Sequence, residues 1–196
     1  MIKRELYMNR IRPFIGGELI KVMTGIRRSG KSVMLELIKE ELAEAGVAPS
    51  QMISINFEDM RYSHLQTATA LHDEIIKRAE GIEGKAYLFF DEIQEVEGWE
   101  KCVNSLRVAL DCDIYITGSN AKLLSGELAT YIGGRYVEFV IYPFSFAEFL
   151  ELYHTIAPSD SIQQCFQKYL LAGGMPYLAN LRYEEEPSRQ YLTDLF

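Results

Sequence analysis

The sequence predicts an α/β fold, in which a mostly parallel five-stranded sheet is flanked by helices and followed by a small C-terminal helical lid. Short apolar segments alternate with amphipathic segments through most of the 196 residues, which is the pattern of β–α–β units. A glycine-rich loop separates the first apolar segment from a helical one, and a later run of apolar residues ends in two acids. Both arrangements are typical of strands whose carboxyl ends face a ligand.

The strands and helices of the sheet domain are expected from the spacing of apolar residues. Mostly apolar runs predict strands at 19–24, 52–57, 86–90, 113–117 and 136–141. Apolar side chains at helical spacing predict helices at 3–15, 33–42, 69–79 and 99–110. We expect Pro13 to disturb the last turn of the first helix. Gly46 suits the position just after the second helix, where a left-handed residue is common.

The character of the chain changes after Pro143, and we divide it there into a core of residues 1–143 and a helical lid of residues 144–196. Ser145, with Glu148 three residues later, predicts a capping box at the start of the first lid helix. Further lid helices are expected at 161–171, 177–181 and 187–196. Because the last expected helix is still apolar at the final residue, we expect the chain to be an N-terminal fragment of something longer.

Residues 25–32, with the sequence GIRRSGKS, fit the pattern of a phosphate-binding P-loop and lie between an expected strand and an expected helix. Gly25 and Gly30 allow the backbone to wrap closely around an anion. Lys31 would reach the β- and γ-phosphates, and the Ser32 hydroxyl would ligate Mg²⁺. The alternative is a glycine-rich turn followed by a lysine at a helix start. The residues expected to bind the nucleotide are Gly25, Ile26, Arg27, Arg28, Ser29, Gly30, Lys31, Ser32 and Val33.

Asp91 and Glu92 end the apolar run 86–90, which is the pattern of a Walker B strand covered on both faces. Asp91 would hold Mg²⁺, directly or through water. Glu92 would polarise the attacking water as a general base. The alternative is that the two acids only cap the next element. A base beside the Walker B acid favours ATP hydrolysis over a small-molecule kinase or a GTPase.

The composition limits the class of protein. A net charge of −8 argues against strong nonspecific nucleic-acid binding by this chain alone. No apolar run approaches the roughly 20 residues of a membrane span, and the N-terminus lacks the apolar region of a signal peptide. We therefore expect a cytoplasmic protein with no membrane partner. Cys102, Cys112 and Cys165 form no Cys-x-x-Cys pair, which fits a reducing compartment and buried thiols.

Further segments accompany the two motifs. They are ITGSN at 116–120, GGR at 133–135, YPFSFAEFL at 142–150 and GGMP at 173–176. Together with the P-loop and FDEIQ at 90–94, they closely resemble a large family of prokaryotic AAA+-type ATPases, over essentially all of the chain. The resemblance implies an AAA+-like P-loop NTPase that hydrolyses ATP with Mg²⁺ and could form a homo-oligomer. In that family a C-terminal domain, often described as restriction-endonuclease-like, follows the core; it is missing here and could bind a protein or DNA partner.

The resemblance also implies roles for individual residues. Ser119 or Asn120 matches a sensor-1 position that would hydrogen-bond the γ-phosphate or the lytic water, although either residue could cap the helix expected after it. Arg135 resembles an arginine finger, which acts on the site of a neighbouring subunit; the alternative is a surface arginine near a turn. Arg182 and Arg189 are candidates for a second sensor only by position.

Several functions are consistent with these motifs. The first is an ATP-driven switch or motor, in which the γ-phosphate orders loops and hydrolysis relaxes them. The second is the regulatory ATPase half of a nucleic-acid-associated protein, for example in defence or mobile-element biology. A binding-only nucleotide switch and a small-molecule phosphotransferase are further alternatives, and the adjacent acids at 91 and 92 disfavour the last.

Overall fold

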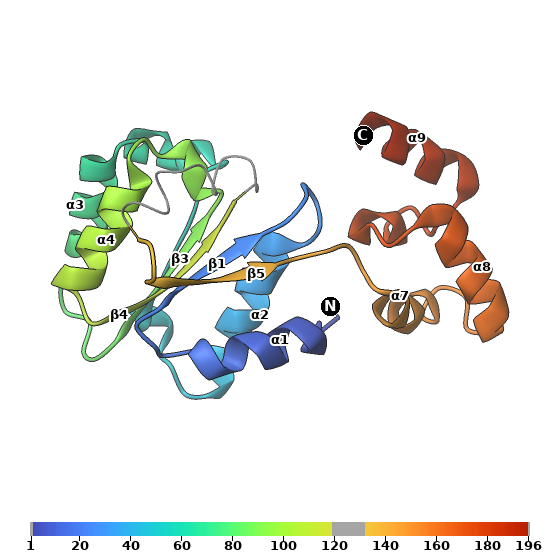
Figure 1. The fold of residues 1–196 in the computed structure, drawn as a ribbon, viewed down its shortest axis with the longest axis horizontal. Coiled ribbons are helices and arrows are strands. Elements are labelled where there is room, and N and C mark those ends of the chain that lie inside the picture. The colour runs from blue at the N-terminus through green and yellow to red at the C-terminus, as the bar shows by residue number, and fades with distance from the viewer. Residues whose placement is uncertain (1, 119–131, 196) are drawn as a thin grey trace. The chain divides into compact units, whose positions relative to one another are not determined.

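The computed structural model describes residues 2–118 and 132–195. Within them the sheet has five strands: β1 (Ile20–Thr24), β2 (Met52–Asn56), β3 (Ala86–Asp91), β4 (Cys112–Thr117) and β5 (Tyr136–Val140). Neighbouring strands pair in parallel, in the order β2-β3-β4-β1-β5 (Figure 1). This confirms the predicted α/β class and its parallel sheet, and every strand begins and ends within one residue of its expected position.

The strand order brings the two sequence motifs to the same edge of the sheet. β1 pairs with β4 up to Met23 and Thr117, and β4 pairs with β3 up to Ile116 and Phe90. The carboxyl ends of β1, β4 and β3 are therefore neighbours. Open parallel sheets bind ligands beyond this edge.

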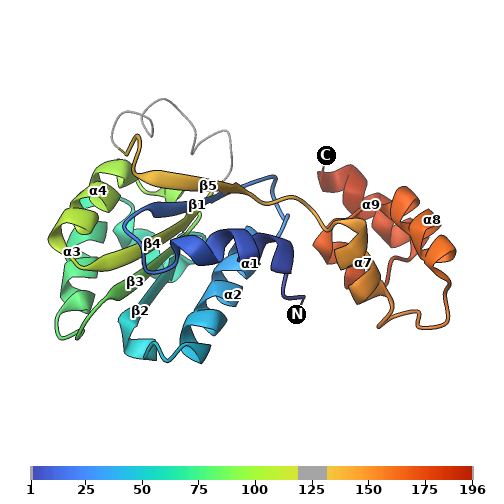
Figure 2. The same cartoon turned by 60° about the horizontal axis from the view of Figure 1, so that its bottom comes forward.

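Helices cover both faces of the sheet, as Figures 1 and 2 show. They are α1 (Glu5–Ile11), α2 (Lys31–Glu44), α3 (Ala68–Ala79) and α4 (Trp99–Ala109). Successive strand residues point to opposite faces, so Phe89 and Tyr115 join a core with α1 and α2. Leu88 and Ile114 join the other core, with α3 and α4. The sheet is thus buried on both sides, which holds its carboxyl edge in place.

The first helix is shorter than expected. α1 ends at Ile11, and a 3₁₀ turn, η1 (Arg12–Phe14), follows it, because Pro13 has no N–H to continue the α-helical pattern. Gly46 follows α2 with a φ of 91°, which agrees with the expected left-handed position. The other 3₁₀ turns of the sheet domain are η2 (Pro49–Gln51), η3 (Met60–Leu65) and η4 (Ile93–Glu95).

The chain divides into two compact units. The sheet unit holds Glu5–Ile26 and Lys31–Ile141. The helical unit holds the N-terminal residues up to Arg4, the segment Arg27–Gly30 and the chain from Tyr142 onward. The helical unit contains α7 (Phe146–Tyr153), α8 (Ile162–Ala172), the 3₁₀ turn η5 (Pro176–Ala179) and α9 (Glu185–Leu195). The division that the sequence predicts after residue 143 stays a prediction.

The helical unit has its own aromatic core. The ring of Phe149 stacks on Tyr153 with centroids 5.1 Å apart and meets the edge of Tyr183 at 4.9 Å. The predicted capping box is confirmed: the Ser145 hydroxyl accepts from the N–H of Glu148 at 3.3 Å, and the Glu148 carboxylate accepts from the N–H of Ser145 at 2.8 Å. The segment expected as a helix at 177–181 is the 3₁₀ turn η5.

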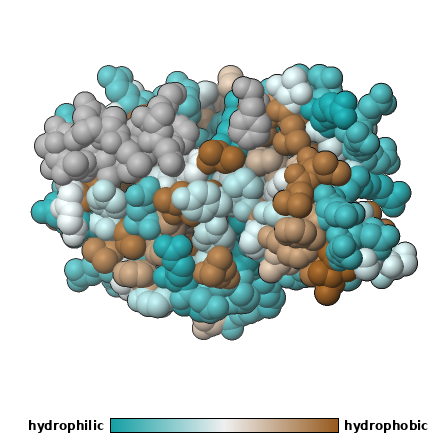
Figure 3. Space-filling model, turned by 45° about the vertical axis from the view of Figure 1, so that its right-hand side comes forward, coloured by the Kyte–Doolittle hydropathy of each residue, from teal (hydrophilic) through white to brown (hydrophobic). Residues whose placement is uncertain are grey.

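The surface of the helical unit is partly apolar. Exposed apolar side chains on α8 are Ile162, Phe166, Leu170 and Leu171. Figure 3 shows hydrophobic residues gathered between hydrophilic ones on one face of the molecule. In the described part of the chain, no helix is both long enough and apolar enough to cross a bilayer.

A charged pair lies buried inside the sheet, between β1 and β4. The side chains of Lys21 and Asp113 are fully buried, and Lys21 Nζ donates to Asp113 Oδ1. The Asp113 carboxylate also accepts from the Tyr115 hydroxyl at 2.7 Å and from the Gly16 N–H at 2.6 Å. Burial lowers the pKa of Lys21, although Asp113 acts in the opposite direction. The Asp113 carboxylate therefore links β4 both to β1, through Lys21, and to the turn before β1, through Gly16.

Replacing Asp113 by Asn is expected to lower the free energy of unfolding by about 3–5 kcal/mol, because it leaves the Lys21 ammonium buried without its counter-charge. Urea denaturation measures this change. Asp111→Asn is the matched control, since Asp111 pairs with Lys85 at the surface. An exposed pair contributes only about 0.2–1 kcal/mol. Equal losses in the two variants would contradict the structural role of the buried pair.

Cys102, on α4, and Cys112, at the start of β4, are free thiols buried in the core, as expected. Burial raises the pKa of Cys102 from an ordinary value of 9.0 to about 12, and a charge interaction with Asp73 adds to the rise. Burial likewise raises the pKa of Cys112 to about 11, with Asp113 acting in the same direction. Both thiols therefore keep their protons in the folded chain at pH values where the unfolded chain loses them.

The stability of the fold is consequently expected to fall at alkaline pH. Below pH 9.0 both states hold the thiol protons, and the full contribution to stability is present. As the pH rises above that value, each thiol lowers the free energy of unfolding by about 1.4 kcal/mol per pH unit. Urea denaturation across this range should show a shallower decline for Cys102→Ala than for the wild type. An unchanged slope would show that this thiol does not contribute.

Candidate nucleotide-binding site

The glycine-rich loop runs from the end of β1 to the start of α2, as the sequence predicts. Gly25 has a φ of 141° and Gly30 a φ of 101°, values that residues with a Cβ rarely adopt. Arg28, between them, is also left-handed, with a φ of 64°. A loop with left-handed residues can turn successive backbone N–H groups toward an anion, as in an anion-binding nest.

Lys31 begins α2 and folds back over its own loop. Its side chain is 5% exposed, and Nζ donates to the carbonyl oxygens of Gly25 and Ile26 at 3.4 Å each. Nζ also lies 3.8 Å from Glu92 Oε1. The structure thus places the lysine of the first motif beside the second acid of the second motif.

The two acids are fixed by a threonine from the neighbouring strand. Thr117, the last residue of β4, is fully buried, and its hydroxyl donates to Asp91 Oδ1. The same hydroxyl accepts from the N–H of Glu92 at 3.0 Å. Thr117 was not among the predicted site residues. A polar residue at the carboxyl end of a buried strand beside the Walker B strand is the signal that could have identified it.

Glu92 has an unusual backbone conformation. Its φ of 55° and ψ of 47° are left-handed, a state that costs a residue with a Cβ about 1–3 kcal/mol. Its carboxylate accepts from Gln94 Nε2, in the turn η4 that follows. The strained turn aims the carboxylate of Glu92 toward Lys31, while Asp91 stays with Thr117. The two adjacent acids therefore occupy different environments.

The remaining loop residues differ in exposure. Ser32 and Val33 are exposed in the first turn of α2, and Ile26, Arg27 and Arg28 are exposed on the loop. The guanidinium of Arg28 lies 5.5 Å from the ring centroid of Tyr191. Ser29 is fully buried, and its hydroxyl has no hydrogen-bond partner among the described residues.

The chemistry of these residues suits the binding of a nucleoside triphosphate with Mg²⁺. The loop supplies backbone N–H groups and an ammonium for phosphates, and Ser32 and Asp91 supply the oxygen ligands that Mg²⁺ prefers. Within residues 2–118 and 132–195, no group of three or more His, Cys, Asp or Glu side chains could hold a metal ion.

Arg135 is not brought to this edge, and the predicted sensor-1 residues cannot be placed. Ser119 and Asn120 lie outside the described residues. Arg135 is exposed immediately before β5, and its Nη1 donates to Asn104 Oδ1 at 2.9 Å. Because Tyr136 pairs with Ile20 at the start of β1, Arg135 lies at the amino edge of the parallel sheet, opposite the loop of residues 25–32.

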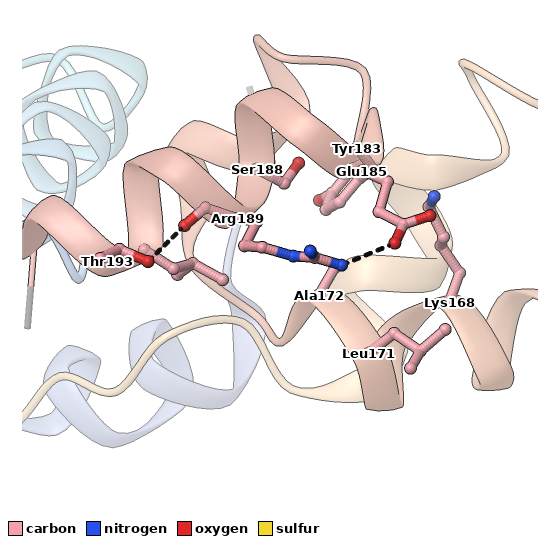
Figure 4. Close-up of a pocket in the computed structure, with 9 residues that line it drawn as sticks. Lys168, Leu171, Ala172, Tyr183, Glu185, Ser188, Arg189 and Thr193 are labelled. Carbon is pink, nitrogen blue, oxygen red and sulfur yellow. Dashed lines mark hydrogen bonds and ion pairs between the residues drawn. The ribbon is translucent and has the colours of Figure 1, made fainter.

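A separate cavity of about 430 Å³ lies within the helical unit (Figure 4). Residues of α8, α9 and the segment between them line it, including Lys168, Leu171 and Arg189. Arg189, a candidate second sensor, pairs with Glu185 at 2.8 Å along α9. No residue of the glycine-rich loop lines this cavity.

A parallel five-stranded sheet, with a glycine-rich loop after β1 and an acidic pair at the end of β3, is the arrangement of a P-loop NTPase fold. The sequence profile of the AAA domain family matches residues 18–150, which is more than half of the chain. The chain belongs to this family.

Two relatives are similar over most of this chain. An uncharacterized protein of Haemophilus influenzae is 44% identical over 176 residues, and the alignment covers 90% of this chain and 44% of the relative. The uncharacterized protein MJ1544 of Methanocaldococcus jannaschii is 34% identical over 189 residues, covering 90% of this chain and 41% of the relative. This chain thus spans less than half the length of both relatives.

Solved structures show the same fold. The Orc1 protein of Aeropyrum pernix, solved in complex with DNA, superposes with a TM-score of 0.54 at 16% identity, covering 96% of this chain and 65% of that one. A mutant of RuvB from Thermotoga maritima superposes with a TM-score of 0.55 at 15% identity, covering 98% and 62%. At these identities the likeness concerns the fold alone.

Proposed function

We propose that this chain is an ATPase module that binds ATP with Mg²⁺ and hydrolyses it to ADP and phosphate in the cytoplasm. One observation carries the proposal: Lys31 Nζ lies 3.8 Å from Glu92 Oε1, at the edge where Thr117 holds Asp91. A phosphate-binding lysine and a base beside a metal-binding acid are the parts that ATP hydrolysis requires.

Each residue of the site has a proposed role. The backbone N–H groups of residues 25–33 would surround the phosphates, and Lys31 would contact the β- and γ-phosphates. Ser32 and Asp91 would hold Mg²⁺, with Thr117 orienting Asp91. When bound, Mg²⁺ neutralises the charge that develops on the phosphate oxygens. Ser119 or Asn120 stays our proposal for the sensor.

Glu92 would act as the general base. The phosphates would compete with its carboxylate for the Lys31 ammonium, since both are anions. Binding would therefore release Glu92 from Lys31, and the carboxylate could then accept a proton from the attacking water. Gln94, which donates to the same carboxylate, would hold its orientation.

ATP turnover at several protein concentrations, with saturating ATP and Mg²⁺, tests this proposal. We expect Mg²⁺-dependent phosphate release whose specific activity rises with protein concentration, because a finger from a neighbouring subunit would complete the site. Transfer of phosphate to an acceptor other than water would support a phosphotransferase instead. Nucleotide binding without phosphate release at any concentration would identify a binding-only switch.

We further propose that the module acts through a homo-oligomer and through a second domain. The relatives are more than twice as long as the matched region, and the resemblance predicts a restriction-endonuclease-like domain after the core. A partner bound by that domain would make this chain the regulatory half of a nucleic-acid-associated protein. Stimulation of turnover by DNA in the full-length protein, weakened by salt, would favour that role over an independent switch or motor.

A further inference from the structure

Arg4 is a buried charge near the N-terminus. It is only 2% exposed and has a left-handed φ of 48°. Its Nε donates to Glu148 Oε1 at 2.8 Å, and its Nη2 reaches Glu148 Oε2 at 3.4 Å. A buried guanidinium needs such a partner, because burying a charge without compensation is costly. A buried arginine held in a strained backbone indicates a specific task.

The guanidinium of Arg4 has further partners in two other segments, the glycine-rich loop and the chain at 142–144. Nη1 donates to the carbonyl oxygen of Ser29 in the glycine-rich loop at 3.0 Å. Nη2 donates to the carbonyl oxygen of Tyr142, where the chain enters the helical unit, at 2.8 Å. The group also lies 5.2 Å from the ring centroid of Phe144. The planar fork of an arginine can satisfy these acceptors together, whereas a lysine ammonium cannot.

The contact with Ser29 depends on the shape of the loop. Gly30 has no Cβ, and a Cβ built there would lie 3.4 Å from Arg4 Nη1. The Ser29 carbonyl belongs to the peptide bond that leads into Gly30, whose φ is 101°, so its direction follows the backbone of the loop. Arg4 therefore contacts the backbone of the loop that is proposed to bind phosphate.

Glu148 joins the same cluster to α7. Its carboxylate accepts from the N–H of Ser145 and caps the helix, and it accepts from Arg4 at the same time. Burial acts to raise the pKa of Glu148, but the hydrogen bonds from Arg4 and Ser145 outweigh it and hold the pKa below its ordinary value. The first turn of α7 is thus linked to the loop through a single guanidinium.

We propose that Arg4 is a positioning residue that couples the conformation of the phosphate-binding loop to α7, so that nucleotide binding changes the stability of the helical unit. This inference rests on the proposed binding of ATP. A ligand shifts a second element only through a difference in contacts between two states, and the bond from Arg4 to the Ser29 carbonyl supplies that difference. Linkage makes the effect reciprocal, so a change in the cluster also alters nucleotide affinity.

Hydrogen exchange of the whole chain, with and without Mg²⁺ and a non-hydrolysable ATP analogue, tests the coupling. In the wild type we expect the analogue to slow exchange in residues 25–35 and, by about fivefold or more, in residues 146–153 of α7. In Arg4→Lys the loop should stay protected, but the slowing in α7 should be lost, because an ammonium paired with Glu148 cannot also hold the Ser29 and Tyr142 carbonyls. Arg10→Lys, at an exposed position of α1, is the matched control.

Glu148→Gln gives an independent test if Arg4→Lys does not fold. The amide can still accept the capping N–H of Ser145 but loses the ion pair, so the nucleotide effect on α7 should again disappear. Full slowing of α7 in both variants would overturn the inference and leave the ATPase proposal intact. The same holds if the wild-type loop is protected while α7 does not respond. No protection of the loop in the wild type would contradict the proposed function and this inference together.

Discussion

Replacing Glu92 by Gln is expected to lower kcat for ATP hydrolysis by about 10²–10⁴-fold, the usual contribution of a general base. The affinity for ATP should change little. The amide has the same shape as the carboxylate but cannot accept a proton from water. The contact that orients the Glu92 backbone uses its N–H and the Thr117 hydroxyl, so the substitution leaves it in place. The substitution also removes the negative charge that competes with the phosphates for Lys31, so the affinity for ATP should not fall.

Steady-state phosphate release and equilibrium binding of a fluorescent ATP analogue separate the two effects. Glu97→Gln is a suitable control, because Glu97 is an exposed acid a few residues further along the same loop. It should leave both values unchanged. Turnover by Glu92→Gln at the wild-type rate would remove Glu92 from the mechanism. A fall in affinity as large as the fall in kcat would instead indicate that Glu92 supports the loop.

Much of the fold could be predicted because its signals are local. A strand of mostly apolar residues, a glycine pair around a loop and a Ser-x-x-Glu capping box each lie within one short segment. The structure therefore agrees with the expected strands, with the loop of residues 25–32 and with the cap at Ser145. Two expected helices differ. The N-terminal one ends early at Pro13, where a local signal was already present, and the segment expected at 177–181 is a 3₁₀ turn.

The contacts that the sequence did not reveal join residues far apart in the chain. Arg4 near the N-terminus resembles a surface arginine until the fold brings it to Glu148. Lys21 did give a signal, since a lysine inside a buried strand requires a partner. Its partner Asp113 could not be chosen from many acids before the order of β1 and β4 was known. Thr117 likewise acquires its role only when β4 lies beside β3.

Asp91 and Glu92 show the same difference between local signals, which the sequence reveals, and long-range contacts, which it does not. The position of this acidic pair after a buried strand was predictable, and so was its place at the ligand-binding edge of the sheet. The left-handed backbone of Glu92, which separates the two carboxylates, could not be predicted. The energetic cost of that conformation is offset by contacts with Thr117 and Gln94, which only the fold brings together. Sequence thus identifies the chemical groups, and tertiary contacts determine which group can act as a base.

Arg135 is expected to contribute to the nucleotide site of a neighbouring subunit and not to the site of its own chain. Thr24, next to the phosphate-binding loop, ends the strand that Ile20 begins, and four residues of strand span about 13 Å. Arg135 lies at the Ile20 end, which is the opposite edge of the sheet from Lys31 and Glu92. In a ring of identical subunits, a head-to-tail interface joins different surfaces of two copies. That arrangement would bring Arg135 of one copy to the site of the next.

Arg135→Ala is therefore expected to lower kcat by about 10³–10⁵-fold, as loss of an arginine finger does. The decisive measurement mixes this variant with Glu92→Gln. Each variant alone should be nearly inactive, but a mixed oligomer pairs an intact Glu92 with an intact Arg135 at about a quarter of its interfaces if copies assemble at random. Activity should reappear on mixing and increase with protein concentration.

Asn104→Ala supplies the control, because it removes the hydrogen bond that Arg135 makes within its own chain and keeps the guanidinium. If Arg135 acts on a neighbour, Asn104→Ala should retain most of the activity. If Asn104→Ala is as inactive as Arg135→Ala and mixing restores nothing, Arg135 supports only its own subunit, and assembly through this residue is excluded. Recovery on mixing, by contrast, requires that residues from two copies meet at one site, which no arrangement within a single chain can provide.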